Sequence, residues 1–395
     1  MKYALLIADG MNDRPVKELD GATPLEVAHT PNIDNMAQRG ALIGVVRNVP
    51  RGFKPGSDIA IMSMLGYDPK SYYTGRGPLE AANLGLKLTD NQVVFRSNFV
   101  TVAEGKMIDY SSSHISNRET EVLIEGLNKK FGSKKFKFYT GISYRNLLIS
   151  EGIGDEVKTI PPHDIIGEEI AKFLPSGLDS ELIRDMMLES QDFLASHDVN
   201  RVRLDLGENP ANMIWLWGQG RRPSFPSFEK KYGVNGFVIS AVDLVNGMAR
   251  SMGLEVVKVP GATGYYDTNY AGKGEYAIEN LKRYDFCCVH LEATDEAGHN
   301  GDLREKIKAI ESFDRHIVGP IYNYLKKGGD YRILISSDHA TPVDLRTHTE
   351  EPVAFICYGK GIKSGIKLKS FNEKNSKATL IEYIGSKLIG EVLFK

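Results

Sequence analysis

Cysteines, long hydrophobic runs and excess charge are all scarce in this sequence. It has 3 cysteines among 395 residues and no CxxC pair of the kind that binds zinc or carries out redox chemistry. Cys287, Cys288 and Cys357 lie within apolar stretches, so we expect buried thiols in a reducing compartment. No apolar run approaches the length of a membrane span, and YALLIA, residues 3–8, is too short for the apolar core of a signal peptide. These absences predict a cytoplasmic protein.

The charge balance excludes a further group of partners. The chain has 49 Lys and Arg against 51 Asp and Glu, a formal net charge of -2. Proteins that bind nucleic acid or anionic lipid normally carry clustered, excess basic residues. The one local lysine cluster, residues 129–137, is expected to be a solvated face. With 42% hydrophobic residues, a chain of this length can fill more than one core, so we expect two domains.

A continuously apolar strand at residues 3–8 opens the chain, and the same pattern returns after residue 233. There, apolar strands such as FCCVHL, RILISS and VAFICYG alternate with helix-like segments, including a long helix expected from Leu303 to Lys327. Strands that are apolar throughout are buried on both faces, which is typical of parallel sheets covered by helices. The sequence therefore predicts an α/β fold with a mostly parallel sheet flanked by helices.

The middle of the chain has a different character. From about Leu84 to Tyr232 it reads as a mixture of polar strands and amphipathic helices, interrupted by turn-forming clusters. This change predicts a smaller α/β cap domain inserted into the first. We expect one discontinuous domain, residues 1–84 and 233–395, and an inserted domain, residues 85–232.

Acids and histidines follow the ends of the apolar strands. They are Asp9, Asp295, His299, Asp338 and His339, with His348 just before the last strand. Ligands of open α/β sheets bind at the carboxyl ends of the strands, so these residues are expected to converge. Burying several carboxylates without a partner is very costly, and a bound cation removes that cost. Each pair alone could be a hydrogen-bonded surface pair, but their recurrence at separate strand ends favours a metal site.

The ligand types favour particular metals. A mixture of carboxylate and imidazole suits manganese or zinc better than magnesium. Six ligands are too many for one ion that keeps a position open for substrate, so we expect two divalent ions, which can clamp a phosphoryl group. The remaining histidines are expected to have structural or surface roles: His29, His163, His197, His290 and His316.

Ser57 is the candidate nucleophile. It follows Pro55 and Gly56 and opens an apolar helical segment, so its hydroxyl would stand at a helix N-terminus that favours anions. A serine at this position can also be a simple N-cap. Coordination to a divalent ion would make its hydroxyl reactive at neutral pH.

Nine stretches, in order, carry a resemblance that extends nearly from end to end. They are ADGMNDRP, TPNIDNMAQRG, KPGSDIAIMSMLGYDP, YYTGRGPLEA, FRSNFVTV, YRNLL, ANMIWLWGQG, ATDEAGHNGD and SSDHATP. With them the chain resembles the archaeal-type cofactor-independent phosphoglycerate mutases of the alkaline phosphatase superfamily. That resemblance implies an alkaline-phosphatase-like fold, no requirement for 2,3-bisphosphoglycerate, and an inserted transferase domain that closes over the substrate.

The resemblance also implies roles for individual residues. One ion would be bound by Asp9, Ser57, Asp338 and His339, and the other by Asp295, His299 and His348. Substrate contacts would come from His114, Arg145, Arg221 and Lys273. Arginine suits such contacts because its planar guanidinium makes paired hydrogen bonds to carboxylate and phosphate. Arg221 and Arg145 could instead form exposed surface ion pairs.

The implied activity is the interconversion of 3-phosphoglycerate and 2-phosphoglycerate through a phosphoserine at Ser57, with water kept out so that the phosphoserine is not hydrolysed. Two other enzymatic functions stay open. The segment DYSSSHIS, residues 109–116, resembles a subgroup proposed to phosphorylate homoserine, although no kinase-type nucleotide loop is present. A metal-dependent phosphomonoesterase would use the same groups. A non-enzymatic protein that holds a phosphorylated metabolite is disfavoured by the complete set of ligands.

Overall fold

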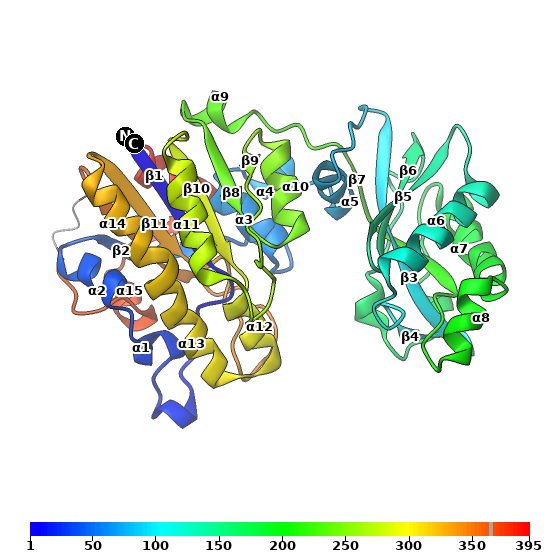
Figure 1. Ribbon diagram of the computed structural model, residues 1–395, viewed down its shortest axis with the longest axis horizontal. Helices are drawn as coiled ribbons and strands as arrows, with labels where there is room; N and C mark the ends of the chain where they lie inside the picture. The colour runs from blue at the N-terminus through cyan, green and yellow to red at the C-terminus, as the bar shows by residue number, and fades with distance from the viewer. Residues whose placement is uncertain (363–365) are drawn as a thin grey trace. The chain divides into compact units, whose positions relative to one another are not determined.

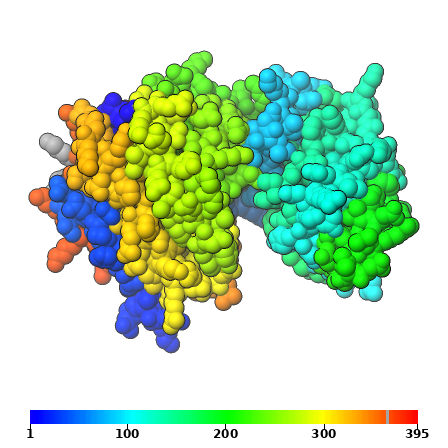
Figure 2. Space-filling model, in the orientation of Figure 1, coloured from blue at the N-terminus to red at the C-terminus, as the bar shows by residue number. Residues whose placement is uncertain are grey.

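The computed structural model describes residues 1–362 and 366–395, and these form two compact units. The larger unit comprises Met1–Tyr73 and Phe225–Lys395, and the inserted unit comprises Thr74–Ser224. The two chain termini lie together in the larger unit (Figure 1). Segments from both ends of the sequence, blue and yellow to red, form the surface of this unit, whereas the inserted unit runs from blue through cyan to green (Figure 2).

The unit boundaries fall before the expected limits at residues 84 and 233, and two short helices explain the difference. Helix α5 (Arg76–Asn83) packs on strands of the inserted unit. Gly77 permits this approach, because a side chain there would meet the backbone of Val94. Helix α9 (Phe228–Tyr232) belongs to the larger unit, where the ring of Phe228 stacks on Phe286 with centroids 4.7 Å apart.

The larger unit is built on an eight-stranded sheet with the order β13-β2-β12-β11-β1-β10-β8-β9. At its centre, β1 (Lys2–Ala8) lies between β10 (Phe286–Leu291) and β11 (Tyr331–Ser336), parallel to both. The flanking strands are β2 (Leu42–Arg47), β8 (Gly236–Ile239), β9 (Glu255–Val256), β12 (Val353–Gly359) and β13 (Glu382–Ile384). Only β12 runs antiparallel to its neighbours, β11 and β2. The expected mostly parallel sheet is confirmed.

Helices flank this sheet (Figure 1). Helices α11 (Tyr270–Leu281), α13 (Leu303–Phe313) and α14 (Gly319–Lys327) pack their apolar sides on alternate strand residues, in one continuous core. The long helix expected at 303–327 is α13 and α14 joined by a π-helical turn, Asp314–Val318. The remaining helices are α1 (Pro24–Val27), α2 (Pro31–Gln38), α3 (Ser57–Met64), α4 (Pro69–Tyr72), α10 (Asp243–Ser251), α12 (Ala293–Asn300), α15 (Glu373–Ala378) and α16 (Gly385–Leu388).

The inserted unit is an α/β unit with an antiparallel five-stranded sheet. Its strands are β3 (Gln92–Ala103), β4 (Lys106–Asp109), β5 (Phe136–Ile142), β6 (Arg145–Glu151) and β7 (Met213–Arg221). Helices α6 (Asn117–Phe131) and α7 (Ser180–Ala195) pack on the sheet, and α8 (Asp198–Asp205) packs beside them. The core between helices and sheet includes Trp215, whose indole nitrogen donates to the carbonyl of Ile160 at 2.8 Å.

Two expectations about the whole chain can be checked against these units. None of the helices in the described residues is long and apolar enough to cross a membrane. All three cysteines are buried, and burial raises the pKa of each thiol above its usual value. The predicted packing role of the cysteines is therefore confirmed.

The central strand of the larger unit gives a test of the fold. Leu6 is fully buried between β10 and β11, so Leu6→Ala is expected to lower the free energy of unfolding by about 2–5 kcal/mol. Leu380→Ala is the matched control, because 92% of that side chain is exposed, and its effect should stay within about 0.5 kcal/mol. Urea denaturation followed by circular dichroism measures both. Equal effects of the two substitutions would contradict the central position of Leu6.

Candidate active site

Three neighbouring parallel strands place the candidate ligands at one edge of the large sheet. Asp9 follows β1, Asp295 lies on α12 just beyond β10, and Asp338 follows β11. Because the three strands are adjacent and parallel, their carboxyl ends meet at the same edge. Gly10 makes this possible: its φ is +60°, and a side chain there would come within 2.5 Å of a carboxylate oxygen of Asp295.

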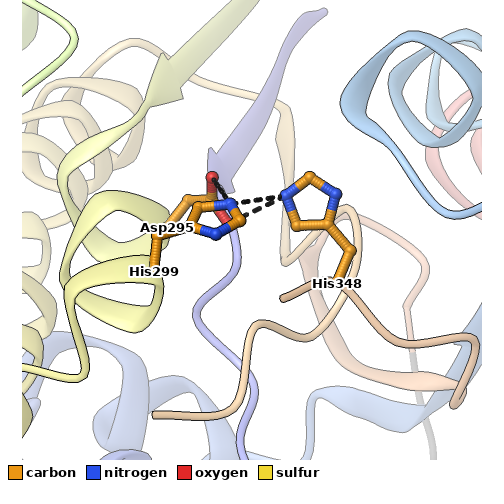
Figure 3. Close-up of side chains that lie close together, drawn as sticks. All are labelled: Asp295, His299 and His348. Carbon is orange, nitrogen blue, oxygen red and sulfur yellow. Dashed lines mark hydrogen bonds and ion pairs between the residues drawn. The ribbon is translucent and has the colours of Figure 1, made fainter. Parts of the chain in front are cut away.

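The first cluster consists of Asp295, His299 and His348 (Figure 3). Asp295 and His299 lie one helical turn apart on α12, so both side chains project from the same face. The Nε2 atom of His299 lies 3.2 Å from Asp295 Oδ2 and 2.8 Å from Nε2 of His348, which in turn lies 3.5 Å from Asp295 Oδ1. One carboxylate and two ring nitrogens thus face a common point.

Backbone carbonyls orient both imidazoles of this first cluster. The Nδ1 atom of His299 lies 3.0 Å from the carbonyl oxygen of Arg346, and Nδ1 of His348 lies 3.4 Å from that of Pro55. A carbonyl oxygen only accepts, so Nδ1 carries the proton in each ring and Nε2 is the nitrogen available to a metal. The hydrogen bond to Asp295 raises the pKa of His299 to about 9. Burial opposes the charge on Asp295, but hydrogen bonds to His299 and His348 hold its pKa well below the usual value.

The second cluster consists of Asp9, Ser57, Asp338 and His339. The Ser57 hydroxyl lies 3.5 Å from Asp9 Oδ2 and 3.4 Å from His339 Nε2. That same Nε2 atom lies 3.3 Å from Asp338 Oδ2 and 3.6 Å from Asp9 Oδ1. The Ser57 side chain starts helix α3, as the sequence predicts. Asp9, Asp295 and His339 also offer ligand atoms within 4.8 Å of one another, so the two clusters adjoin.

The electrostatics of the second cluster favour a cation. Asp9 Oδ1 and Asp338 Oδ2 are buried and have no hydrogen-bond partner among the described residues. Burial, together with the charges of Asp338 and Asp295, raises the pKa of Asp9 well above its usual value. Burial lowers the pKa of His339, which keeps a lone pair available on its ring. Unsatisfied carboxylate oxygens beside a neutral imidazole are suitable ligands for a divalent ion, so the residues fit the expected metals.

The sequence analysis missed the role of His290, which was expected to be structural or at the surface. His290 lies on β10 and is fully buried, and its Nε2 atom is 3.1 Å from Asp9 Oδ2. Its Nδ1 atom is 3.2 Å from Glu292 Oε1. Residues 288, 290 and 292 alternate with the core residues of β10, so a period of two along this strand was the signal that could have found it.

The four predicted substrate contacts differ in their surroundings. Lys273 is fully buried on α11, where its ammonium pairs with Glu292. Arg221 bonds Asp155 at 2.6 Å and the carbonyl of Asp90 at 3.0 Å. The direct substrate contacts of these two residues stay predictions. His114 and Arg145 both lie against the ring of Tyr144 in the inserted unit, with the His114 ring centroid at 5.6 Å and the Arg145 guanidinium carbon at 5.9 Å from its centroid.

A second residue that the sequence analysis missed, Arg96, lies near Arg145. Its guanidinium is buried over the ring of Trp217, with 4.3 Å to the centroid, and pairs with Glu80 at 3.0 Å. Burial lowers the pKa of Arg96, and the charges of Arg76 and Arg145 act in the same direction. This region of the inserted unit therefore concentrates positive charge around one carboxylate.

Comparisons with known proteins agree with the geometry. A family model described as 2,3-bisphosphoglycerate-independent phosphoglycerate mutase matches residues 37–200. A protein named 2,3-bisphosphoglycerate-independent phosphoglycerate mutase 2, from Methanothermobacter thermautotrophicus, is 49% identical over 375 residues, which cover 94% of this chain and 92% of its own. The chain belongs to this mutase family.

Further members and solved structures extend the same result. A mutase of the same name from Methanosarcina acetivorans is 47% identical over 95% of both chains. The structure of a protein from Pyrococcus horikoshii has a TM-score of 0.82 at 30% identity, covering 99% of this chain and 96% of its own. The cofactor-independent phosphoglycerate mutase from Thermoplasma acidophilum has a TM-score of 0.68 at 26% identity over 99% of both chains. The resemblance predicted from the sequence is confirmed.

The raised pKa of His299 predicts how metal binding depends on pH. Without metal, this imidazole is protonated below a pH of about 9, and an ion that binds Nε2 must displace the proton. We expect the affinity of the first cluster for Mn²⁺ to fall by about tenfold for each pH unit below 9, if one proton is released. Calorimetric titration in buffers of different ionisation enthalpy measures both the Mn²⁺ affinity and the number of protons released. Affinity that does not change between pH 7 and 9, with no proton release, would contradict the assignment of His299 as a ligand.

Proposed function

We propose that this mutase family member interconverts 3-phosphoglycerate and 2-phosphoglycerate through a phosphoserine at Ser57, at a site that binds two divalent ions. The family membership supports the reaction and its independence from 2,3-bisphosphoglycerate. One observation carries the mechanism: the Ser57 hydroxyl, at the N-terminus of α3, faces both Asp9 and His339 within 3.5 Å. The nucleophile, two buried carboxylates and an imidazole thereby share one centre.

Two sets of residues would hold the ions. The first is Asp295, His299 and His348, and the second is Asp9, Ser57, Asp338 and His339. When bound, the ions would lower the pKa of the Ser57 hydroxyl and neutralise charge on the phosphoryl oxygens. Manganese is the proposed metal because it accepts both carboxylate and imidazole ligands.

A cytoplasmic location of the protein also stays a prediction.

In the proposed reaction, the phosphoryl group is transferred from the substrate to Ser57 and then back to the other hydroxyl of glycerate. The Ser57 oxygen forms a bond to phosphorus while the bond between phosphorus and the substrate oxygen breaks, and that oxygen takes up a proton equivalent to the one the serine loses. The second hydroxyl of glycerate then attacks the phosphoserine, and Ser57 regains a proton. The N-terminus of α3, where the N-cap residue Gly56 makes no side-chain hydrogen bond, would favour the negative phosphoryl group at this position. His114 and Arg145 remain proposed contacts for the substrate's charged groups.

Substitution of the nucleophile tests this function. Ser57→Ala is expected to reduce conversion of 3-phosphoglycerate to 2-phosphoglycerate by at least about a thousandfold, because no other hydroxyl is assigned to receive the phosphoryl group. The assay contains Mn²⁺ and no 2,3-bisphosphoglycerate, and follows the product with an enolase-coupled absorbance change. Ser71→Ala, at an exposed serine of α4, is the matched control and should retain activity.

Three outcomes would count against the proposal. Full activity of the Ser57→Ala variant would remove Ser57 from the mechanism. Release of inorganic phosphate in place of 2-phosphoglycerate would favour the phosphomonoesterase. Phosphorylation of homoserine by a nucleoside triphosphate, with no turnover of 3-phosphoglycerate, would favour the kinase-type alternative.

A further inference from the structure

A chain of four buried ionisable side chains ends at Asp9. The ammonium of Lys273 pairs with Glu292 and also donates to the carbonyl oxygen of His290 at 2.8 Å. Glu292 Oε1 lies 3.2 Å from Nδ1 of His290, and Nε2 of the same ring lies 3.1 Å from Asp9 Oδ2. Each of the four residues is at most 3% exposed.

Stability does not account for this network. Burying four ionisable groups has a large desolvation cost, and apolar side chains of similar volume often stabilise a protein as much or more. The network also occupies the interior of the unit that carries the metal candidates, and it ends at one of them, because His290 Nε2 lies 3.1 Å from Asp9 Oδ2. A role in arranging Asp9 explains both its position and its cost.

The network fixes the imidazole of His290 rigidly. Glu292 Oε1 accepts the backbone N–H of Ala241 at 2.6 Å and the hydroxyl of Ser240 at 3.0 Å, so this carboxylate is itself held in place. Its contact with Nδ1 sets the orientation of the ring, as second ligands do for many metal-bound histidines. Nε2 is thereby kept 3.1 Å from Asp9 Oδ2.

This contact makes the two oxygens of Asp9 unequal. Oδ2 is held by His290, whereas Oδ1 has no hydrogen-bond partner in the described residues and lies 3.6 Å from His339 Nε2. The carboxylate can therefore present one fixed, unsatisfied oxygen to a cation. Rotation of Asp9 would instead exchange the two oxygens and displace the group that faces Ser57.

We propose that His290, oriented by Glu292 and Lys273, is a positioning residue that holds Asp9 in the geometry required by the ion beside Ser57. The inference rests on the proposed metal site and adds three residues to it. It also gives Lys273 a function: its ammonium balances the Glu292 carboxylate that orients the ring, in place of the direct substrate contact predicted from the sequence. Among the described residues, the polar contacts of the His290 ring are with Asp9, Glu292 and Ser240. None of these belongs to the adjoining cluster of Asp295, His299 and His348, so that cluster should be unaffected.

Metal binding tests the proposal independently of activity. For His290→Phe, equilibrium dialysis with Mn²⁺ is expected to show one ion bound ten- to a hundredfold more weakly and the other unchanged, which is the effect of losing an outer hydrogen bond to a ligand. His290→Gln retains an N–H donor and should recover part of this affinity. Glu292→Gln, which preserves shape and removes only the charge, should show an intermediate loss and provides the test if His290→Phe does not fold.

A matched control separates positioning from general destabilisation. Asp314→Asn removes another buried carboxylate of the larger unit, whose hydrogen bonds run to Asn32 and Ile33 and to none of the proposed ligands. It should lower the melting temperature without changing the affinity for either ion. Unchanged Mn²⁺ affinity in His290→Phe, or a loss no larger than in Asp314→Asn, would overturn the proposal.

Pulsed electron paramagnetic resonance of the Mn²⁺ protein distinguishes positioning from direct ligation. The proposal predicts nitrogen couplings from three histidines, His299, His339 and His348, and the same couplings in His290→Gln. A fourth coupling that disappears in His290→Gln would assign His290 as a ligand and overturn its positioning role. If the wild-type protein binds Mn²⁺ as expected but does not interconvert 3-phosphoglycerate and 2-phosphoglycerate, that result counts against the proposed function alone.

Discussion

Electrostatic repulsion among three buried carboxylates is the constraint on which the rest of the larger unit depends. Asp9, Asp295 and Asp338 stand at the ends of adjacent parallel strands, and their separation is set by the sheet rather than by their own charges. Such an arrangement is tolerated only if positive charge is supplied to it. The histidines of both clusters, the buried Lys273 and the proposed ions all meet this demand. The fold thus forces like charges together at this site, and the proposed cations would offset their repulsion.

The side chains of the site come from strands, helices and one loop. Strands β1, β10 and β11 position the acids, because backbone hydrogen bonds fix the register of these strands. Helices supply His299, in the last turn of α12, and Ser57, at the start of α3, and the loop before β12 supplies His348. Rigid elements therefore carry the groups that repel one another, whereas the loop carries a group that is drawn in by attraction.

Much of this could be predicted from the sequence, for a definite physical reason. Strands that are apolar throughout imply a parallel sheet, and a parallel sheet brings distant residues such as Asp9 and Asp338 to one edge. His290 was not recognised because it lies within such a strand, where a titratable side chain looks like a packing residue. Its partner Lys273 lies on a different element, so no local pattern links them. The unit boundaries were also misplaced, because the short helices α5 and α9 have too few residues to show which core they join.

One contact in the site connects two segments that otherwise share no secondary structure. The ring of His348 rests against the carbonyl oxygen of Pro55, two residues before the nucleophile. A proposed ligand of one cluster and the peptide that leads into α3 are therefore joined by one hydrogen bond. A shift of that imidazole on binding an ion would act on the backbone before Ser57, and so couple the proposed nucleophile to the cluster to which it does not belong.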